Sequence, residues 1–204
     1  MKVAIVGGTG VFGRALAKRL QELGQDEVVV GSRDAERAQA AAEELGVQGG
    51  RNEEIVREAD LVVLAVKSNA TLDTARDLAD AIGATPVLCV ASDLRFTLAG
   101  VLPGKHQGSL AEEVARVVRA PVASGLQSFA AANLTAGDPG DALICGDDER
   151  AKELALELAA RLGDRAIDVG PLGNSRALEG MTAVILNVNK RYKAHAGIRL
   201  TGLP

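Results

Sequence analysis

The sequence predicts an α/β protein of the Rossmann type, a doubly wound parallel sheet flanked by helices, with a small C-terminal lobe. Three observations support this prediction. A short apolar segment near the N-terminus leads into a glycine-rich turn and then into an amphipathic helix. The run LVVLAV at residues 61–66 is almost continuously apolar, which is typical of a parallel strand covered on both faces. Strand-like runs alternate with helical periodicity along most of the chain.

The N-terminal turn carries the first functional motif. Residues 3–6 form the expected strand, and Gly8, Gly10 and Gly13 follow with the spacing GxGxxG before a helix at 14–23. In this motif the first glycine permits a tight turn, the second lets a pyrophosphate approach the backbone, and the third lets the helix pack close to the strand. The start of the helix also offers free N–H groups to phosphate. In this position the motif favours a dinucleotide site over an ordinary glycine-rich turn.

Periodicity and turn residues predict the other elements of the first half. We expect a strand at 27–30, a helix capped by Asp34 and reaching Leu45, a loop at 46–51, a short helix at 52–58, a strand at 61–66, a helix at 72–82 and a strand at 87–90. A long loop is expected at 92–108, because three glycines and a proline interrupt that segment.

The second half is expected to form a helix at 110–118, strands at 121–126 and 143–145, a helix at 149–162 capped by Asp147 or Asp148, a strand at 166–169 and a helix at 175–189. We treat residues 1–204 as one compact unit. Its dinucleotide-binding core spans residues 1–120, and a smaller lobe at 121–204 completes the substrate pocket. Residues 183–189 (AVILNVN) are more apolar than one buried face requires, so they form either central core or, as we favour, a homodimer seam.

Composition excludes several classes of protein. The chain has 204 residues, of which 47% are hydrophobic and 25% charged, as in ordinary globular proteins. A net charge of −4 with only three Phe and one Tyr argues against a nucleic-acid partner. The sequence shows neither a leader nor a bilayer-spanning run, so we expect no membrane partner. Cys89 and Cys145 lie in apolar runs and are expected as buried free thiols of a cytoplasmic protein, and no Cys/His spacing predicts a metal site.

The end of the second strand indicates NADP(H) rather than NAD(H). An NAD site places Asp or Glu there to bind the ribose hydroxyls, whereas this chain has Gly31, Ser32 and Arg33, with Arg37 one helical turn further. A hydroxyl and a guanidinium suit the 2′-phosphate. Asp34 would repel a phosphate, but its place suits a helix cap. The alternative is that both arginines are solvated surface charges.

Longer segments of the chain resemble the NADPH-dependent coenzyme F420 reductases, also called F420-dependent NADP oxidoreductases. The resemblance starts with MKVAIVGGTGVFGRALAKRL, VVVGSR and LVVLAV, and it continues through TARDLAD, LICGDDERAK, IDVGPLGNSRALE and AGIRL. It therefore covers essentially the full chain in order, and CGDDE with DxGPLxNSRxLE is far more specific than the glycine motif. It implies an oxidoreductase that transfers hydride between NADP(H) and the deazaflavin coenzyme F420.

The resemblance also assigns roles to positions of this sequence. It implies that Thr9, Gly10, Val11 and Phe12 line the pyrophosphate, that Ser32, Arg33 and Arg37 hold the 2′-phosphate, that Ala65, Val66 and Lys67 lie against the nicotinamide half, and that the loop 127–132, with Gln127 and Ala131, lies near the nicotinamide and F420. Hydride transfer between two carriers requires positioning rather than an acid–base pair. We therefore assign no catalytic acid or base, and Lys67 and Gln127 are candidates for the pocket.

At three places the chain differs from residues that the resemblance leads us to expect. Gln127 stands in place of a histidine, Lys67-Ser68 in place of a proline and an aromatic residue, and Ala130 in place of a proline. Two alternatives therefore stay open: an NADPH-dependent reductase of free flavin or another acceptor, and a redox sensor that binds NADPH without turnover. Lys67 could also be a solvated lysine at a strand end, and Gln127 a turn amide satisfied by backbone.

Overall fold

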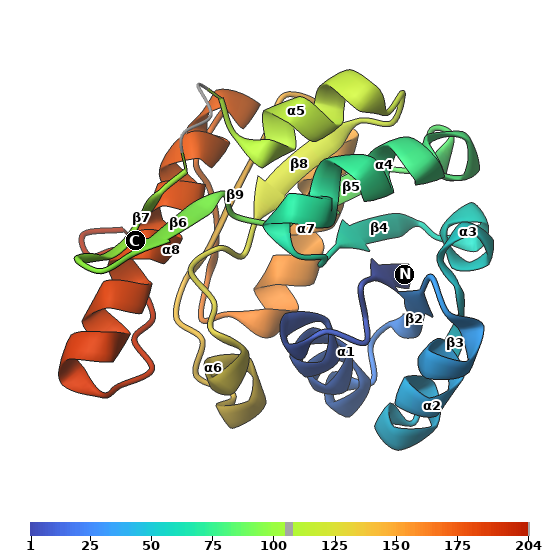
Figure 1. Ribbon diagram of the computed structural model, residues 1–204, viewed down its shortest axis with the longest axis horizontal. Helices are drawn as coiled ribbons and strands as arrows, with labels where there is room; N and C mark the ends of the chain where they lie inside the picture. The colour runs from blue at the N-terminus through green and yellow to red at the C-terminus, as the bar shows by residue number, and fades with distance from the viewer. Residues whose placement is uncertain (105–107, 204) are drawn as a thin grey trace.

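An eight-stranded sheet forms the centre of the protein in a computed structural model that describes residues 1–104 and 108–203 (Figure 1). In order across the sheet, the strands are β10 (Ala166–Asp168), β9 (Ala142–Gly146), β8 (Val122–Gly125), β5 (Val87–Cys89), β4 (Leu61–Leu64), β1 (Lys2–Val6), β2 (Glu27–Ser32) and β3 (Gln48–Arg51). The six strands from β8 to β3 are mutually parallel, in the order of a doubly wound nucleotide-binding sheet. The predicted Rossmann-type α/β fold is therefore confirmed.

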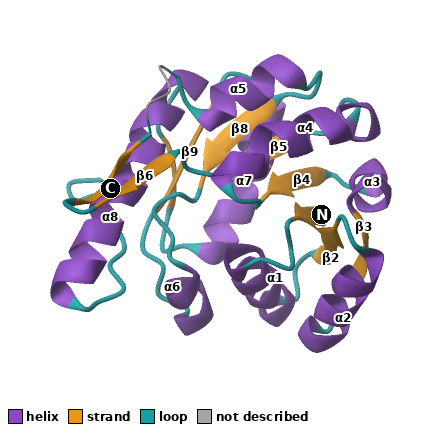
Figure 2. Ribbon diagram, in the orientation of Figure 1, coloured by secondary structure: helices purple, strands orange, loops and turns teal. Residues whose placement is uncertain are grey.

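Helices cover both faces of this sheet (Figure 2). On one face lie α1 (Val11–Leu23), α2 (Ala35–Leu45), α6 (Ala131–Ala136) and α7 (Glu149–Leu162). On the other lie α3 (Asn52–Ile55), the 3₁₀ helix η1 (Val56–Glu58), α4 (Ser68–Ile82), α5 (Leu110–Val117) and the 3₁₀ helix η2 (Leu172–Asn174). The last helix, α8 (Ser175–Tyr192), packs on β9 through Leu178. Among residues 1–104 and 108–203, we find no helical segment with the length and hydrophobicity that a bilayer span requires.

The strands near the centre are buried on both faces, which explains their continuous apolar sequence. In β1, Val3 and Ile5 contact the cluster under α1 and α7, whereas Ala4 and Val6 contact the cluster under α4 and α5. All four side chains are fully buried. Because successive residues of a strand point to opposite faces, a strand between two helical layers needs apolar residues at every position.

Aspartates begin two of the helices, as predicted. The Asp34 side chain accepts a hydrogen bond from the backbone N–H of Arg37 at 3.2 Å, at the start of α2. At the start of α7, the Asp148 side chain accepts from the backbone N–H of Ala151 at 2.9 Å. Asp147, the alternative cap, instead accepts from the backbone N–H of Leu172 at 2.9 Å. The structure therefore selects Asp148 as the cap.

The expected loop at 46–51 is wrong, because residues 48–51 form the edge strand β3 beside β2. Its sequence, QGGR, lacks the apolar and β-branched residues that indicate a strand. A Cβ atom on Gly49 would lie 2.6 Å from the carbonyl oxygen of Ala38 in α2. The close approach of α2 thus requires glycine at position 49. Because glycine is uncommon in strands, the sequence of this segment does not indicate one.

The expected long loop at 92–108 is also wrong in part. Residues 94–103 form an antiparallel hairpin of β6 (Leu94–Thr97) and β7 (Gly100–Pro103). Asn187 of α8 holds it, because Val101 donates its N–H to Asn187 Oδ1 at 2.9 Å and accepts from Nδ2 at 2.6 Å. Residues 105–107 of the expected loop lie outside the described residues. Because Asn187, which stabilises the hairpin, lies 86 positions from Val101 in the sequence, the local sequence alone predicts a loop.

Three smaller differences concern element boundaries and direction. Helix α4 starts at Ser68 rather than at residue 72, and the short helix α6 lies in a segment for which none was predicted. Strand β9 runs antiparallel to β8, so the sheet is not parallel throughout. Strands β8, β9 and β10 nevertheless continue the same sheet, and the predicted boundary near residue 120 falls inside it. The division into a core and a lobe stays a prediction.

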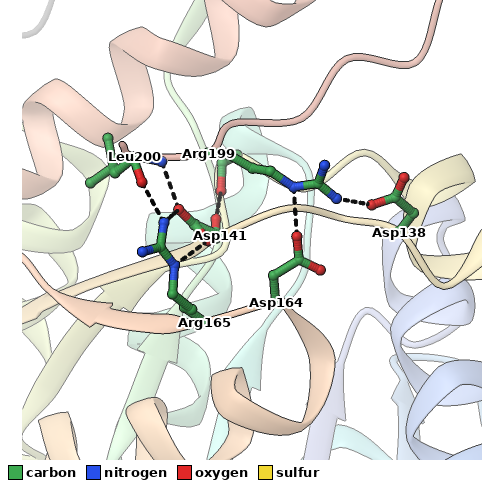
Figure 3. A network of polar contacts seen from close by, with 7 residues as sticks. Asp138, Asp141, Asp164, Arg165, Arg199 and Leu200 are labelled. Carbon is green, nitrogen blue, oxygen red and sulfur yellow. Dashed lines mark hydrogen bonds and ion pairs between the residues drawn. The ribbon is translucent and has the colours of Figure 1, made fainter. Parts of the chain in front are cut away.

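Ionic contacts tie the C-terminal segment to the sheet (Figure 3). Arg199 donates to Asp138 and to Asp164, each at 2.6 Å. The backbone N–H of Leu200 donates to Asp141 Oδ2 at 2.7 Å, and Arg165 contacts the same carboxylate. Residues that follow α8 are therefore held against the loops around β9 and β10.

Candidate functional site

A cleft of about 800 Å³ opens at the carboxyl ends of β1 and β4. The order of the strands reverses between these two, and ligands of doubly wound sheets bind outside that point. The cleft is formed by the turn after β1, the end of β2 with the start of α2, the start of α3, and the segment from β4 into α4. Its lining residues are Gly7, Thr9, Gly10, Val11, Phe12, Ser32, Arg33, Asp34, Arg37, Asn52, Ala65, Val66, Lys67, Ala70 and Thr74.

The glycine turn packs closely against the sheet. Gly7 has a φ of 87°, a left-handed conformation that favours glycine, and a Cβ there would lie 2.7 Å from the carbonyl oxygen of Ala65. The motif assigned the tight turn to Gly8, but the residue that this turn requires to be glycine is Gly7. Gly8 and Gly13 do not line the cleft: a Cβ on Gly8 would meet Val30, and one on Gly13 would clash with the carbonyl oxygen of Gly7. Gly8 therefore lets the turn pack against β2, and Gly13 lets helix α1 approach the turn.

The N-terminus of α1 lies at the cleft, and Val11 and Phe12, its first two residues, are part of the lining. Gly10 is the N-cap residue and no side chain caps the helix. A Cβ on Gly10 would meet only the carbonyl oxygen of Gly7, at 3.3 Å, so the space in front of the helix is open. The first N–H groups of a helix and its positive dipole end attract anions. This end of the cleft therefore suits a pyrophosphate, as the motif predicted.

Ser32 and two arginines lie at the end of the cleft near β2. Ser32 Oγ accepts the backbone N–H of Asp34 at 3.2 Å, which leaves its hydroxyl hydrogen free to donate. The guanidinium groups of Arg33 and Arg37 take part in no ion pair or hydrogen bond within residues 1–104 and 108–203. The carboxylate of Asp34 also lines the cleft, although one of its oxygens caps α2. A hydroxyl donor and two free guanidinium groups are the donors that a phosphate monoester prefers.

Lys67 lies at the opposite wall, where β4 passes into α4. Its carbonyl oxygen accepts from the backbone N–H of Ala70 at 2.8 Å and from Thr71 Oγ1 at 3.1 Å, which fixes the turn. Lys67 is the N-cap residue of α4, and no side chain caps this helix either. Its ammonium group pairs with no acid in the described part of the chain. The cleft thus lies between two uncapped helix starts and carries unpaired positive charge.

Gln127 is buried behind the ends of β5 and β8, and it does not line the cleft. Its Nε2 donates to Ser124 Oγ at 2.8 Å and to the carbonyl oxygen of Cys89 at 3.3 Å, but its Oε1 is buried and has no hydrogen-bond partner within residues 1–104 and 108–203. The preceding residue, Leu126, has a φ of 67°, which is rare for a side chain of this size. Of the amide atoms of Gln127, only the nitrogen is satisfied, by one backbone carbonyl and one side-chain hydroxyl, so the alternative of a turn amide satisfied by backbone is met in part.

The other predicted residues divide between the cleft and its surroundings. Ala65 and Val66 lie in the lining beside Lys67, whereas Ala131, the first residue of α6, does not line it. Cys89 and Cys145 are buried free thiols, as predicted, and burial raises the pKa of each to about 12. No group of three or more His, Cys, Asp or Glu side chains in the described ranges could hold a metal ion.

Comparison with known proteins identifies the family. The profile described as "NADP oxidoreductase coenzyme F420-dependent" matches residues 2–91. An F420-dependent NADP reductase of Methanothermobacter marburgensis is 35% identical over 224 aligned positions, which cover all of both chains. The chain belongs to the F420-dependent NADP reductase family. One from Methanocaldococcus jannaschii is 34% identical over all of this chain and 99% of its own. The resemblance stated from the sequence motifs is thus confirmed.

The fold of this family member is also seen in crystal structures. A candidate F420-dependent NADP-reductase from Arthrobacter sp. FB24 superposes with a TM-score of 0.85 at 23% identity. The match covers 98% of this chain and 99% of that one. At this level of identity the likeness concerns the fold alone, which is shared along the full chain.

Sequence-based prediction missed five lining residues of the cleft. They are Gly7, Asp34, Asn52, Ala70 and Thr74. A signal for Gly7 was present, because it adjoins Gly8 directly after the strand. Asp34 was predicted only as a helix cap. Asn52 is the first residue of α3, and Ala70 and Thr74 belong to the first two turns of α4. They reach the cleft only through the packing of these helices beside the sheet, and no local motif marks them.

Proposed function

We propose that this protein is an oxidoreductase that transfers hydride between NADP(H) and coenzyme F420. Relatives that are 34–35% identical along the whole chain are F420-dependent NADP reductases. The observation that carries the proposal is the cleft where the strand order reverses, with an uncapped helix start next to two free arginines and a serine hydroxyl. That combination suits a dinucleotide that carries an additional phosphate.

The residues of the cleft fit this ligand in order along its length. We assign the pyrophosphate to Thr9 and the start of α1, where any side chain on Gly10 would occupy the open space. The 2′-phosphate belongs with Ser32, Arg33 and Arg37. The nicotinamide half then lies toward Ala65, Val66 and Lys67, at the end of β4.

The chain contributes binding and orientation to the reaction. NADP(H), when bound, supplies or accepts the hydride, and F420 is its partner in the exchange. Transfer between two flat rings depends on their distance and alignment, and it needs no proton donor of the kind that carbonyl reduction requires. We assign Gln127 and Ala131 to the wall behind the two rings. Gln127 does not line the cleft, and its Nε2 is held by hydrogen bonds to Ser124 and Cys89, so its part is to support that wall.

Turnover of purified protein with NADPH and a panel of acceptors tests this function. We expect NADPH oxidation to depend on F420, with FMN, FAD and ferric iron far slower. Turnover with free flavin and none with F420 would support the reductase of another acceptor instead. NADPH binding without turnover on any acceptor would support the redox sensor. Either result would overturn the proposal.

We also propose a homodimer, formed by a hairpin–α8 surface that comprises Phe96, Leu98 and Leu102 of the hairpin and Val184, Val188 and Tyr192 of α8. These are large apolar side chains with exposures from 37% to 108%. The neighbouring Ala183 and Ile185 are buried, so the apolar run of α8 serves both the core and an exposed face. An exposed apolar patch of this kind is typical of an interaction surface.

The remaining assignments follow from charge and thiol chemistry. We infer that the partners of this protein are small-molecule cofactors and a second copy of the chain, not nucleic acid, because the net charge is −4. Two buried free thiols suit the reducing conditions of the cytoplasm, where we place the protein.

A further inference from the structure

Asn52 is a buried polar residue in the wall of the cleft with no assigned role. It is the first residue of α3 and directly follows β3, and its side chain is only 4% exposed. Its Oδ1 is buried without a hydrogen-bond partner. No side-chain hydrogen bond of Asn52 is formed within the described ranges. A buried amide without protein partners is costly, and the NH₂ group of this amide remains available to a ligand.

The surroundings of Asn52 indicate which end of the amide faces the cleft. A Cβ on Gly31 would lie 2.5 Å from Asn52 Oδ1 and 2.5 Å from Ile55 Cδ1, so the oxygen faces the backbone of β2 and an aliphatic side chain. C–H groups are weak donors that suit an oxygen and would leave an NH₂ group unsatisfied. Because Oδ1 is covered and Asn52 lines the cleft, the Nδ2 group is the end that faces the cleft.

Strand pairing brings Asn52 to the same end of the cleft as the arginines. Arg51 of β3 is the register partner of Ser32 of β2, so the next residue, Asn52, lies beside the turn at Arg33. Ser32, Arg33, Arg37 and Asn52 all line one cleft. The cleft wall therefore combines the neutral NH₂ donor of Asn52 with the hydroxyl of Ser32 and the guanidinium groups of the two arginines.

We propose that Asn52 is a specificity-determining residue that donates its side-chain N–H to the 2′-phosphate of NADP(H). The inference rests on the NADP(H) site of the proposed function. An amide donates to phosphate oxygens without adding charge, whereas a carboxylate of the same shape repels a phosphate and accepts from ribose hydroxyls. The identity of residue 52 thus favours the phosphorylated dinucleotide over the free ribose diol.

Titration of the protein with NADPH and with NADH, followed by nicotinamide fluorescence, tests this role without any acceptor. We expect Asn52→Asp to raise the Kd for NADPH about tenfold or more, because a donor becomes a repelling charge. The Kd for NADH should change less than about threefold or fall. Asn52→Ala, which removes the donor without adding charge, should raise the Kd for NADPH by a smaller factor and leave that for NADH within about twofold.

Gln48→Glu is the matched control, because it adds the same charge at an exposed position of β3 outside the cleft. It should leave both affinities unchanged, and thermal unfolding should show that each variant is folded. If Asn52→Asp does not fold, Asn52→Ala decides. Equal weakening of NADPH and NADH, or no weakening of NADPH in either variant, would overturn the inference. A wild-type protein that discriminates NADPH through Asn52 but fails with F420 would overturn only the proposed function.

Discussion

The guanidinium of Arg165 contacts both carboxylate oxygens of Asp141, with Nε 3.1 Å from Oδ1 and Nη2 2.7 Å from Oδ2 (Figure 3). Asp141 is almost fully buried, and it also accepts the backbone N–H of Leu200 at 2.7 Å. Hydrogen bonds from Arg165 hold the pKa of Asp141 below its ordinary value. One carboxylate therefore joins the segment before β9, the segment before β10 and the C-terminal segment.

Replacing this carboxylate should destabilise the protein. We expect Asp141→Asn to lower the free energy of unfolding by about 1–3 kcal/mol, because Arg165 and Leu200 lose a charged acceptor. Chemical denaturation at pH 7 measures the loss. The control is Asp73→Asn, which breaks an exposed pair with Arg76 and should cost less than about 1 kcal/mol. Because the folded pKa is lowered, the contribution of Asp141 is fully present above the unfolded pKa of about 3.9 and is lost as pH falls through the folded pKa. A stability of the variant equal to the wild type at pH 7 would contradict this role.

Glu179 should make stability depend on pH in the opposite sense. This buried carboxyl of α8 accepts the backbone N–H of Leu110 at 2.8 Å and that of Asp93 at 3.1 Å, and burial raises its pKa to about 7. The folded state then holds the proton more tightly than the unfolded state, so raising the pH from about 4.3 to about 7 lowers stability. In Glu179→Gln, the decrease of the free energy of unfolding over this pH range should be smaller by about 1–3 kcal/mol. Denaturation curves at pH 5, 6, 7 and 8 compare the two proteins, and parallel pH profiles would show that Glu179 does not titrate in this range.

Arg33 should discriminate between the two dinucleotides. We expect Arg33→Ala to weaken NADPH binding by about 1.5–3 kcal/mol through loss of a charge-assisted contact, and to leave NADH binding nearly unchanged. Fluorescence titration gives both affinities. Arg57→Ala is a suitable control, because Arg57 is exposed and does not line the cleft. Equal losses for NADPH and NADH would remove Arg33 from the 2′-phosphate site.

Alanine substitutions at two glycines of the same motif should affect different properties, stability at Gly13 and dinucleotide binding at Gly10. Gly13→Ala places a Cβ against the carbonyl oxygen of Gly7, so it should lower the free energy of unfolding by about 1–3 kcal/mol. Gly10→Ala meets only one atom, at 3.3 Å, so it should change stability by less than about 1 kcal/mol but weaken NADPH and NADH alike. Thermal unfolding and titration separate the effects. Loss of stability without loss of binding in Gly10→Ala would place the pyrophosphate elsewhere.

A charge on the hairpin–α8 surface should dissociate the homodimer. Val184 is 61% exposed and lies in the middle of α8, so Val184→Glu should yield a folded monomer in sedimentation velocity experiments. Ala40→Glu, at an exposed position of α2, is the control and should remain dimeric. A dimeric Val184→Glu protein would move the interface to another surface. A monomeric wild type at every concentration would contradict the homodimer itself.

Local sequence predicted the elements that are stabilised by residues within or next to the element itself. The strands at the centre of the sheet are apolar at every position because both faces are buried, and the capping aspartates of α2 and α7 lie within three residues of the backbone N–H groups that donate to them. The cleft residues at the turn after β1 and the end of β2 could be predicted for the same reason. They follow directly on strands that the pattern locates, and parallel strands present their carboxyl ends at one edge.

The doubly wound sheet, the glycine turn and the side chains that we expect to hold the 2′-phosphate could be predicted from the sequence, since these depend on neighbours a few positions away. The three-dimensional packing of the chain was needed to show that QGGR is a strand and that residues 94–103 form a hairpin held by Asn187. It was also needed to show that Asn52 and Gln127 carry buried oxygens without hydrogen-bond partners among the described residues. Each of these features depends on contacts between segments far apart in the chain. The burial and hydrogen bonding of a residue are set by those contacts, which no local pattern of residues records.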